Sequence, residues 1–82
     1  MSQNNLRMIH TYADFCKYHD QGNIRPDLTS HLGRKSLNRL KEMGWHIGYW
    51  RPQTDFLRIC RSSDENFQTA YQTAGIDFWV RE

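Results

Sequence analysis

The 82-residue sequence has no apolar run that approaches the roughly 18 residues of a transmembrane helix. Its first residues, Met1 to Asn5, lack the basic segment and apolar stretch that mark a signal peptide. Only two cysteines are present, whereas a disulfide-stapled domain of this size normally carries at least about four. We therefore expect a soluble, cytoplasmic protein in a reducing compartment, with no membrane partner.

The motifs of the common enzyme classes are missing as well. The chain has no glycine-rich phosphate loop, no pair of catalytic carboxylates, and no Ser-His-Asp or Cys-His arrangement. A two-cysteine, two-histidine zinc site is a formal alternative, but its spacing matches neither a zinc finger nor a ribbon. The side chains concerned are Cys16, His19, His46 and Cys60. We expect no enzymatic activity, no metal and no cofactor.

The composition is that of a folded protein. Hydrophobic residues make up 38% of the chain, aromatic residues 13% and charged residues 24%, which argues against intrinsic disorder. The length fits one domain, so we expect residues 1–82 to form a single domain, with residues 1–4 flexible.

Charge is unevenly distributed although the net charge is only +2. Residues 34–61 carry seven basic and two acidic side chains, whereas residues 62–82 carry one basic and four acidic side chains. Clustered positive charge is typical of proteins that bind a polyanion. The alternative is a solvated basic surface balanced by a nearby acidic helix.

Apolar spacing predicts three helices in the first half of the chain. Residues 5–20 form an amphipathic pattern with one apolar face. Residues 24–26 are expected to be extended because Pro26 restricts the residue before it. A short helix over 28–32 is expected to stop at Gly33, and a third helix over 34–43 at Gly44. The third helix would bury Leu37, Leu40 and Met43.

After Gly44 the apolar period changes to two, which predicts a β-hairpin with strands over 45–50 and 56–61. Ser62 and Glu65 match a capping box for a last helix. That helix would pack Phe67, Ala70, Tyr71 and Ala74 into the core. Residues 76–80 alternate as a terminal strand able to pair with the hairpin. The expected fold is α+β, with helices on one face of a small antiparallel sheet.

The segment from Asp27 to Arg61 resembles the winged helix-turn-helix superfamily. The resemblance rests on the short helix at 27–32, the Gly33 turn, the helix from Ser36 to Met43 with the following Gly44-Trp45, and the two-stranded wing. It implies that the third helix lies in a DNA major groove and that the wing contacts the backbone. Lys35, Asn38 and Arg39 would then face base edges, and Arg34, Lys41, Arg51 and Arg58 would contact phosphates.

These expectations favour a small non-enzymatic regulator of transcription that binds double-stranded nucleic acid. A protein-binding inhibitor or adaptor, of a phage or mobile-element type, is the alternative. It would act on a nucleic-acid-handling complex, with Trp50 and Trp79 as interface residues, because exposed Trp next to Arg is typical of protein interfaces. Alternatively, these two tryptophans cover the far face of a thin sheet or form a homodimer contact.

A ribonuclease is the third hypothesis. The segment from Leu37 to Ile59 resembles small ribonuclease toxins built on a double-stranded-RNA-binding-like fold. Those toxins use a histidine at the start of the second strand, where this chain reads Thr54-Asp55-Phe56. RNA cleavage would therefore need a different set of side chains to converge, namely His46, Tyr49, Arg51 and Arg58.

Overall fold

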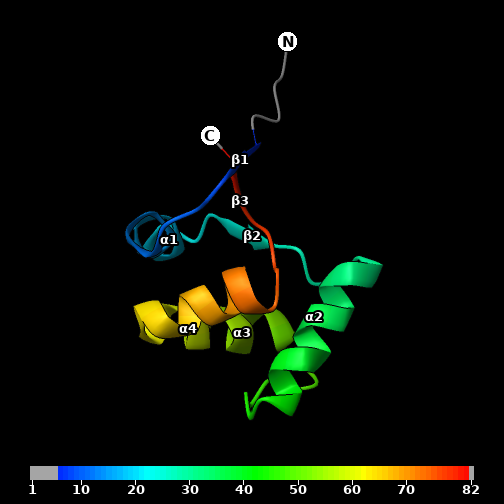
Figure 1. Ribbon diagram of the computed structural model, residues 1–82. Helices are drawn as coiled ribbons and strands as arrows, with labels where there is room; N and C mark the ends of the chain where they lie inside the picture. Colours follow the sequence, from blue (N-terminus) through cyan, green and yellow to red (C-terminus); the bar gives the residue numbers. More distant parts are fainter. Residues whose placement is uncertain (1–5, 82) are drawn as a thin grey trace.

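The computed structural model describes residues 6–81, which fold into four α-helices, one π-helical turn and a three-stranded sheet (Figure 1). The elements are β1 (Leu6–Met8), α1 (Tyr12–Asp20), β2 (Ile24–Pro26), α2 (His31–Glu42), α3 (Pro52–Ser62), α4 (Asp64–Gln68), the π-turn η1 (Thr69–Thr73) and β3 (Phe78–Arg81). The α+β class is confirmed. The expected flexibility of residues 1–4 lies outside the described residues.

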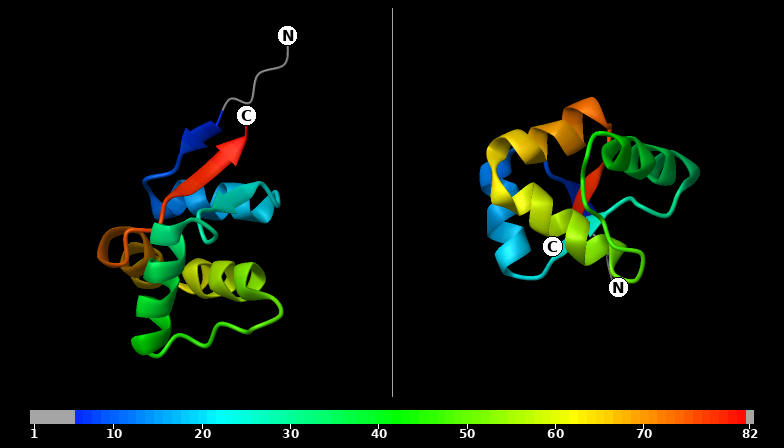
Figure 2. Two further views of the ribbon diagram at one scale, coloured as in Figure 1. Left: turned by 90° about the vertical axis from the view of Figure 1, so that its right-hand side faces the viewer. Right: turned by 90° about the horizontal axis from the view of Figure 1, so that it is seen from below.

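The sheet has the order β1-β3-β2, and both pairings are antiparallel. Its central strand is the last in the chain and alternates between the two faces. Phe78 and Val80 are fully buried, whereas Trp79 is partly exposed. Helices α1, α3 and α4 cover the buried face, and α2 stands to one side of them (Figure 2).

The core is built around four phenylalanines. Phe15 of α1, Phe56 of α3, Phe67 of α4 and Phe78 of β3 are all fully buried. The ring of Phe78 lies 5.2 Å from Phe15, 5.7 Å from Phe56 and 5.2 Å from Phe67, measured between ring centroids. One strand residue thus joins three helices to the sheet.

The prediction that a helix begins near residue 5 is wrong. The helix begins at Tyr12, because Thr11 caps it by accepting a hydrogen bond from the Asp14 N–H at 3.2 Å. Residues 6–8 form β1 instead, and Ile9 continues it by donating its N–H to the Phe78 carbonyl at 3.0 Å. The extended conformation expected for residues 24–26 is confirmed as β2.

The Gly33 turn is also wrong, since one continuous helix spans His31–Glu42. Ser30 caps it by accepting the Gly33 N–H at 2.9 Å, and Asp27 accepts the Ser30 hydroxyl at 2.7 Å. A Cβ on Gly33 would lie 2.2 Å from the Asp27 carbonyl oxygen. Glycine is therefore required here by close approach rather than by a turn.

The prediction for the C-terminal end of α2 is confirmed in part. Glu42 is its last residue, and Gly44 follows with a φ of 104°, a left-handed conformation that favours glycine. Leu37 and Leu40 are buried, but Met43 is 51% exposed.

The predicted hairpin, and with it the wing, is wrong. Residues 45–51 contain no strand, and Pro52–Ser62 form α3. Pro52 suits the first helical position because the backbone N–H that proline lacks would have no acceptor within the helix there. Phe56 and Cys60, four residues apart, become the buried stripe, while Leu57 and Ile59, which would face the core in the predicted strand, are half-buried.

The last helix and terminal strand are largely as predicted. The cap is Ser63, which accepts the Asn66 N–H at 3.1 Å, rather than Ser62. Phe67, Ala70 and Ala74 are buried, and Tyr71 stacks on Phe67. The strand pairs with β1 and β2 in place of the absent hairpin. None of the helices within residues 6–81 has the length and apolar character needed to span a bilayer.

Candidate functional site

Helix α2 presents most of its circumference to solvent. Only Gly33, Leu37 and Leu40 are buried, along one narrow side. The other side carries every residue of this helix that the sequence analysis selected, all exposed: Arg34, Lys35, Asn38, Arg39 and Lys41. The helix lies beside the layer formed by α3 and α4 (Figure 1). Its exposed face is therefore accessible to a large ligand.

The cations of α2 fall on two edges of this exposed face. A helix with 3.6 residues per turn places Arg34 and Lys41 on one edge, Lys35 and Arg39 on the other, and Asn38 between them. Each edge borders a groove. The first groove, of about 520 Å³, lies on the side of Ala74, the residue after η1, and is lined by Leu32, Lys35, Ser36, Asn38, Arg39, Glu42 and Ala74.

The second groove, of about 350 Å³, lies between α2 and the start of α3. Its lining is Leu28, Thr29, Arg34, Leu37, Asn38, Lys41, Gly48, Tyr49, Pro52 and Gln53. We call it the Tyr49 groove. Its lining combines apolar side chains, an aromatic ring, two amides and two cations. No carboxylate is among its lining residues, in contrast to the first groove, which includes Glu42.

Most of the selected cations have no acidic partner in the part of the chain that the structure describes. Within residues 6–81, no carboxylate lies within ion-pair distance of five of them: Arg34, Lys35, Arg39, Lys41 and Arg51. Arg58 differs, because it lies on α3 and its guanidinium is 3.9 Å from the Asp55 carboxylate. Its expected place on a wing strand is wrong, and its charge is locally balanced.

The loop that follows α2 exposes two aromatic rings. Tyr49 is 84% exposed and Trp50 is 88% exposed, and their rings meet edge to face with centroids 5.2 Å apart. In the predicted strand over 45–50, a period of two would put Tyr49 on the same side as Trp45 and Ile47. Those two do pack against the core, half-buried, but Tyr49 does not. From the sequence, Tyr49 is expected only within the ribonuclease hypothesis, and not as an exposed ring beside α2.

Asp55 holds this loop in place. Its carboxylate accepts the Gly48 N–H at 2.7 Å and lies beside Arg58. The carboxylate is only 25% exposed, so the hydrogen bond is partly shielded from water. Asp55 thereby fixes the backbone directly before Tyr49 and Trp50.

We predict that Asp55→Ala loosens the loop without unfolding the domain. A hydrogen bond to a charged group contributes about 1.5–3 kcal/mol, so protection of the Gly48 amide should fall roughly tenfold or more. Amide hydrogen exchange measures this. Asp55→Asn, which keeps an acceptor oxygen, should retain most of the protection, and Arg58→Ala should leave it nearly unchanged. Equal loss in all three variants would contradict the assignment.

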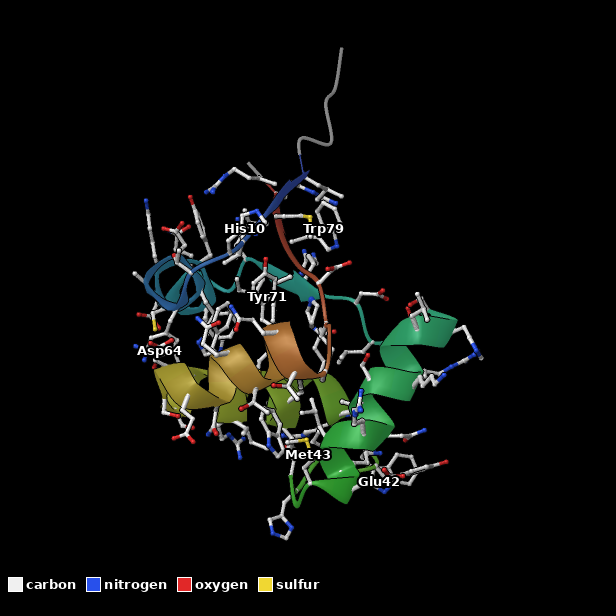
Figure 3. The ribbon with its side chains drawn as sticks, viewed as in Figure 1. His10, Glu42, Met43, Asp64, Tyr71 and Trp79 are labelled. Atoms are coloured by element: carbon white, nitrogen blue, oxygen red, sulfur yellow. The ribbon has the colours of Figure 1, made fainter. Side chains whose placement is uncertain are left out.

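Trp79 lies away from α2. It sits on β3 opposite Met8 and Arg25, on the sheet face that the helices leave uncovered, and it is half-buried. Figure 3 places Trp79 and the C-terminal end of α2, marked by Glu42 and Met43, at opposite ends of the molecule. Trp79 therefore lies on a different part of the molecule from the C-terminal end of α2.

The cysteines and histidines do not converge. Cys60 is fully buried, and burial raises its pKa, so it remains a neutral thiol that packs as a small apolar side chain. His19 stacks on Phe15, and His46 is exposed in the loop. Within residues 6–81 no three His, Cys, Asp or Glu side chains are placed to hold a metal ion.

Comparisons of the chain with protein-family models, with curated proteins and with solved structures found no match. The winged-helix resemblance is therefore confirmed by no structural neighbour, and residues 6–81 contain no wing.

Proposed function

We propose that this chain is a non-enzymatic nucleic-acid-binding protein whose contact surface is α2 and the loop that follows it. One observation carries the proposal: the exposed face of α2 holds four cations, and Arg51 a fifth, without a carboxylate partner in the described chain. Lys and Arg side chains without an acidic partner contribute most to the binding free energy when they contact phosphates. Each contact releases counterions condensed on the nucleic acid, and no existing ion pair has to be broken.

The arrangement also suits recognition of bases. Asn38 lies between the two basic edges of α2, where phosphate contacts would bracket it. An amide in that position can pair with an adenine edge, and the flanking cations set its register on the backbone. Residues 6–81 contain no wing to contact the nucleic-acid backbone. The 45–51 loop would supply those contacts instead.

We predict that Lys35→Ala combined with Arg39→Ala weakens nucleic-acid binding by roughly tenfold or more near 50 mM salt. The slope of log K against log salt should fall by about 0.9 per lost contact on a duplex and about 0.7 on a single strand. Fluorescence anisotropy with labelled oligonucleotides over a salt series measures both.

The matched control is Lys17→Ala combined with Arg58→Ala. It removes the same charge from the opposite helix α1 and from the balanced pair on α3, so the affinity should change little. Absence of binding to any oligonucleotide by the wild-type chain near 50 mM salt would refute the proposal, since the counterion term is then large.

A protein-binding inhibitor or adaptor is the second candidate. The observation that favours it is the pair of almost fully exposed rings, Tyr49 and Trp50. Tyr, Trp and Arg dominate the binding energy of protein interfaces. Affinity capture from the native host with and without nuclease separates the two functions. A specific partner retained after nuclease treatment, and lost on Trp50→Ala, would favour the protein-binding function.

A further inference from the structure

We propose that the Tyr49 groove holds an unstacked base with its phosphate, so that the ligand of this site is single-stranded nucleic acid. This inference rests on the proposed function and narrows its ligand class. The lining of the groove offers a partner for each part of a nucleotide.

The lining offers a base both an aromatic ring and apolar side chains. Tyr49 supplies the ring, and Leu28, Leu37 and Pro52 are the apolar lining residues. The volume of about 350 Å³ lies in the range of about 300–1,000 Å³ that is usual for small-ligand pockets. Stacking on an aromatic ring accepts any base, because each base has a π-face.

The edge of the base and the phosphate also find partners. Asn38 and Gln53 provide amide donors and acceptors at the groove, and Arg34 and Lys41 provide positive charge. No lining residue is acidic. Asp27, which adjoins the groove next to Leu28, already accepts hydrogen bonds from Ser30 at 3.3 and 2.7 Å. The groove is therefore complementary to an anion.

The backbone directly before the Tyr49 ring is anchored. Asp55 accepts the Gly48 N–H, and the exposed rings of Tyr49 and Trp50 contact each other edge to face. The anchor at Gly48 lowers the conformational freedom that the loop backbone loses when a base stacks on Tyr49. Trp50 and Arg51 follow Tyr49 directly in the chain. The base of a neighbouring nucleotide can therefore stack on Trp50, and its phosphate can pair with Arg51.

A duplex cannot use this groove. In a duplex each base face is covered by the next base pair, and unstacking costs a few kcal/mol. A single strand presents its faces freely. The charge on α2 attracts both ligands, but only the single strand gains the contact with Tyr49. The inference thus predicts a preference that charge alone does not.

The test is fluorescence anisotropy with a labelled thymidine 12-mer, and with a mixed-sequence DNA duplex of the same length, at one salt concentration. The wild-type chain should bind the single strand more tightly. Tyr49→Ala should weaken single-strand binding about 5- to 150-fold, which corresponds to about 1–3 kcal/mol of stacking, and leave duplex binding unchanged. Tyr49→Phe, which keeps the ring, should bind nearly as the wild type.

His10→Ala is the control, since it removes an exposed aromatic ring that lies far from the C-terminal end of α2 and the loop that follows it (Figure 3). Thermal melting shows that each variant is folded. Suppose that Tyr49→Ala leaves single-strand affinity within twofold of the wild type while Lys35→Ala combined with Arg39→Ala weakens it. That result would overturn the groove assignment and leave the proposed function standing. Duplex binding as tight as single-strand binding would overturn it too. Absence of binding to either ligand would refute both proposals.

Discussion

Replacing Phe78 with alanine is expected to lower the free energy of unfolding by about 3–5 kcal/mol. The ring is fully buried and contacts the phenylalanines of α1, α3 and α4, so its loss leaves a cavity where sheet and helices meet. A domain of this size has only about 5–15 kcal/mol of net stability, so much of it would be lost. Urea denaturation at low temperature measures the change.

Two variants make this result specific. Phe78→Leu fills most of the same space and should cost distinctly less than alanine. Leu32→Ala removes an apolar side chain that is 71% exposed, and should change the stability by no more than about 0.5 kcal/mol. If Phe78→Ala were as mild as Leu32→Ala, the four-ring core described here would be wrong.

Gly33→Ala is expected to be the second most damaging change, and its sign is informative. Alanine in place of glycine inside a helix normally stabilises by about 1 kcal/mol. Here the new Cβ would lie 2.2 Å from the carbonyl oxygen of Asp27, so the 27–30 segment must move. Such overpacking costs about 1–3 kcal/mol, and the hydrogen bonds of the Ser30 cap would be strained with it. Thermal and urea unfolding report the loss.

The same helix offers a control for that result. Asn38→Ala replaces a weak helix former by a strong one at an exposed position, so it should raise stability by a few tenths of a kcal/mol. Gly33→Asn separates the two roles considered for this glycine. A left-handed turn would tolerate asparagine better than alanine, whereas close approach makes the larger side chain at least as harmful. Greater stability of the asparagine variant would argue for the turn.

The part of α2 after Gly33 and the last helix could be predicted from apolar spacing because each has a single periodicity. Residues 56–61 have two. Leu57 and Ile59 alternate as in a strand, while Phe56 and Cys60 repeat as in a helix, and the sequence does not choose between them. Pro52 and Asp55 in the first turn of α3 are the local signals that favour the helix. The choice is completed by packing of Phe56 on Phe78.

Strand β1 could not be predicted from its neighbours in the sequence. Leu6 and Met8 fit the apolar face of a helix as well as the alternation of a strand. Their pairing partners, Arg81 and Trp79, lie at the other end of the chain. A local pattern carries no information on such a distant partner, so the tertiary contact overrides the helical spacing.

The candidate site was predictable in the part that depends on one helix. The exposed cations of α2 follow directly from its apolar stripe. The groove does not, because Tyr49 reaches α2 only through an irregular loop whose conformation depends on the bond from Gly48 to Asp55. The balance of Arg58 by Asp55 likewise appears only once residues 52–62 are helical.

The position of β3 has a consequence for biosynthesis. This strand is the middle of the sheet, yet it is made after both of its neighbours. While the chain emerges from the ribosome, β1 and β2 have no strand to pair with. Three of the four core phenylalanines are translated before Phe78, the residue against which they pack. Folding must therefore await translation of residues 78–81, and a nascent chain that stalls earlier would expose its aromatic core to chaperones and proteases.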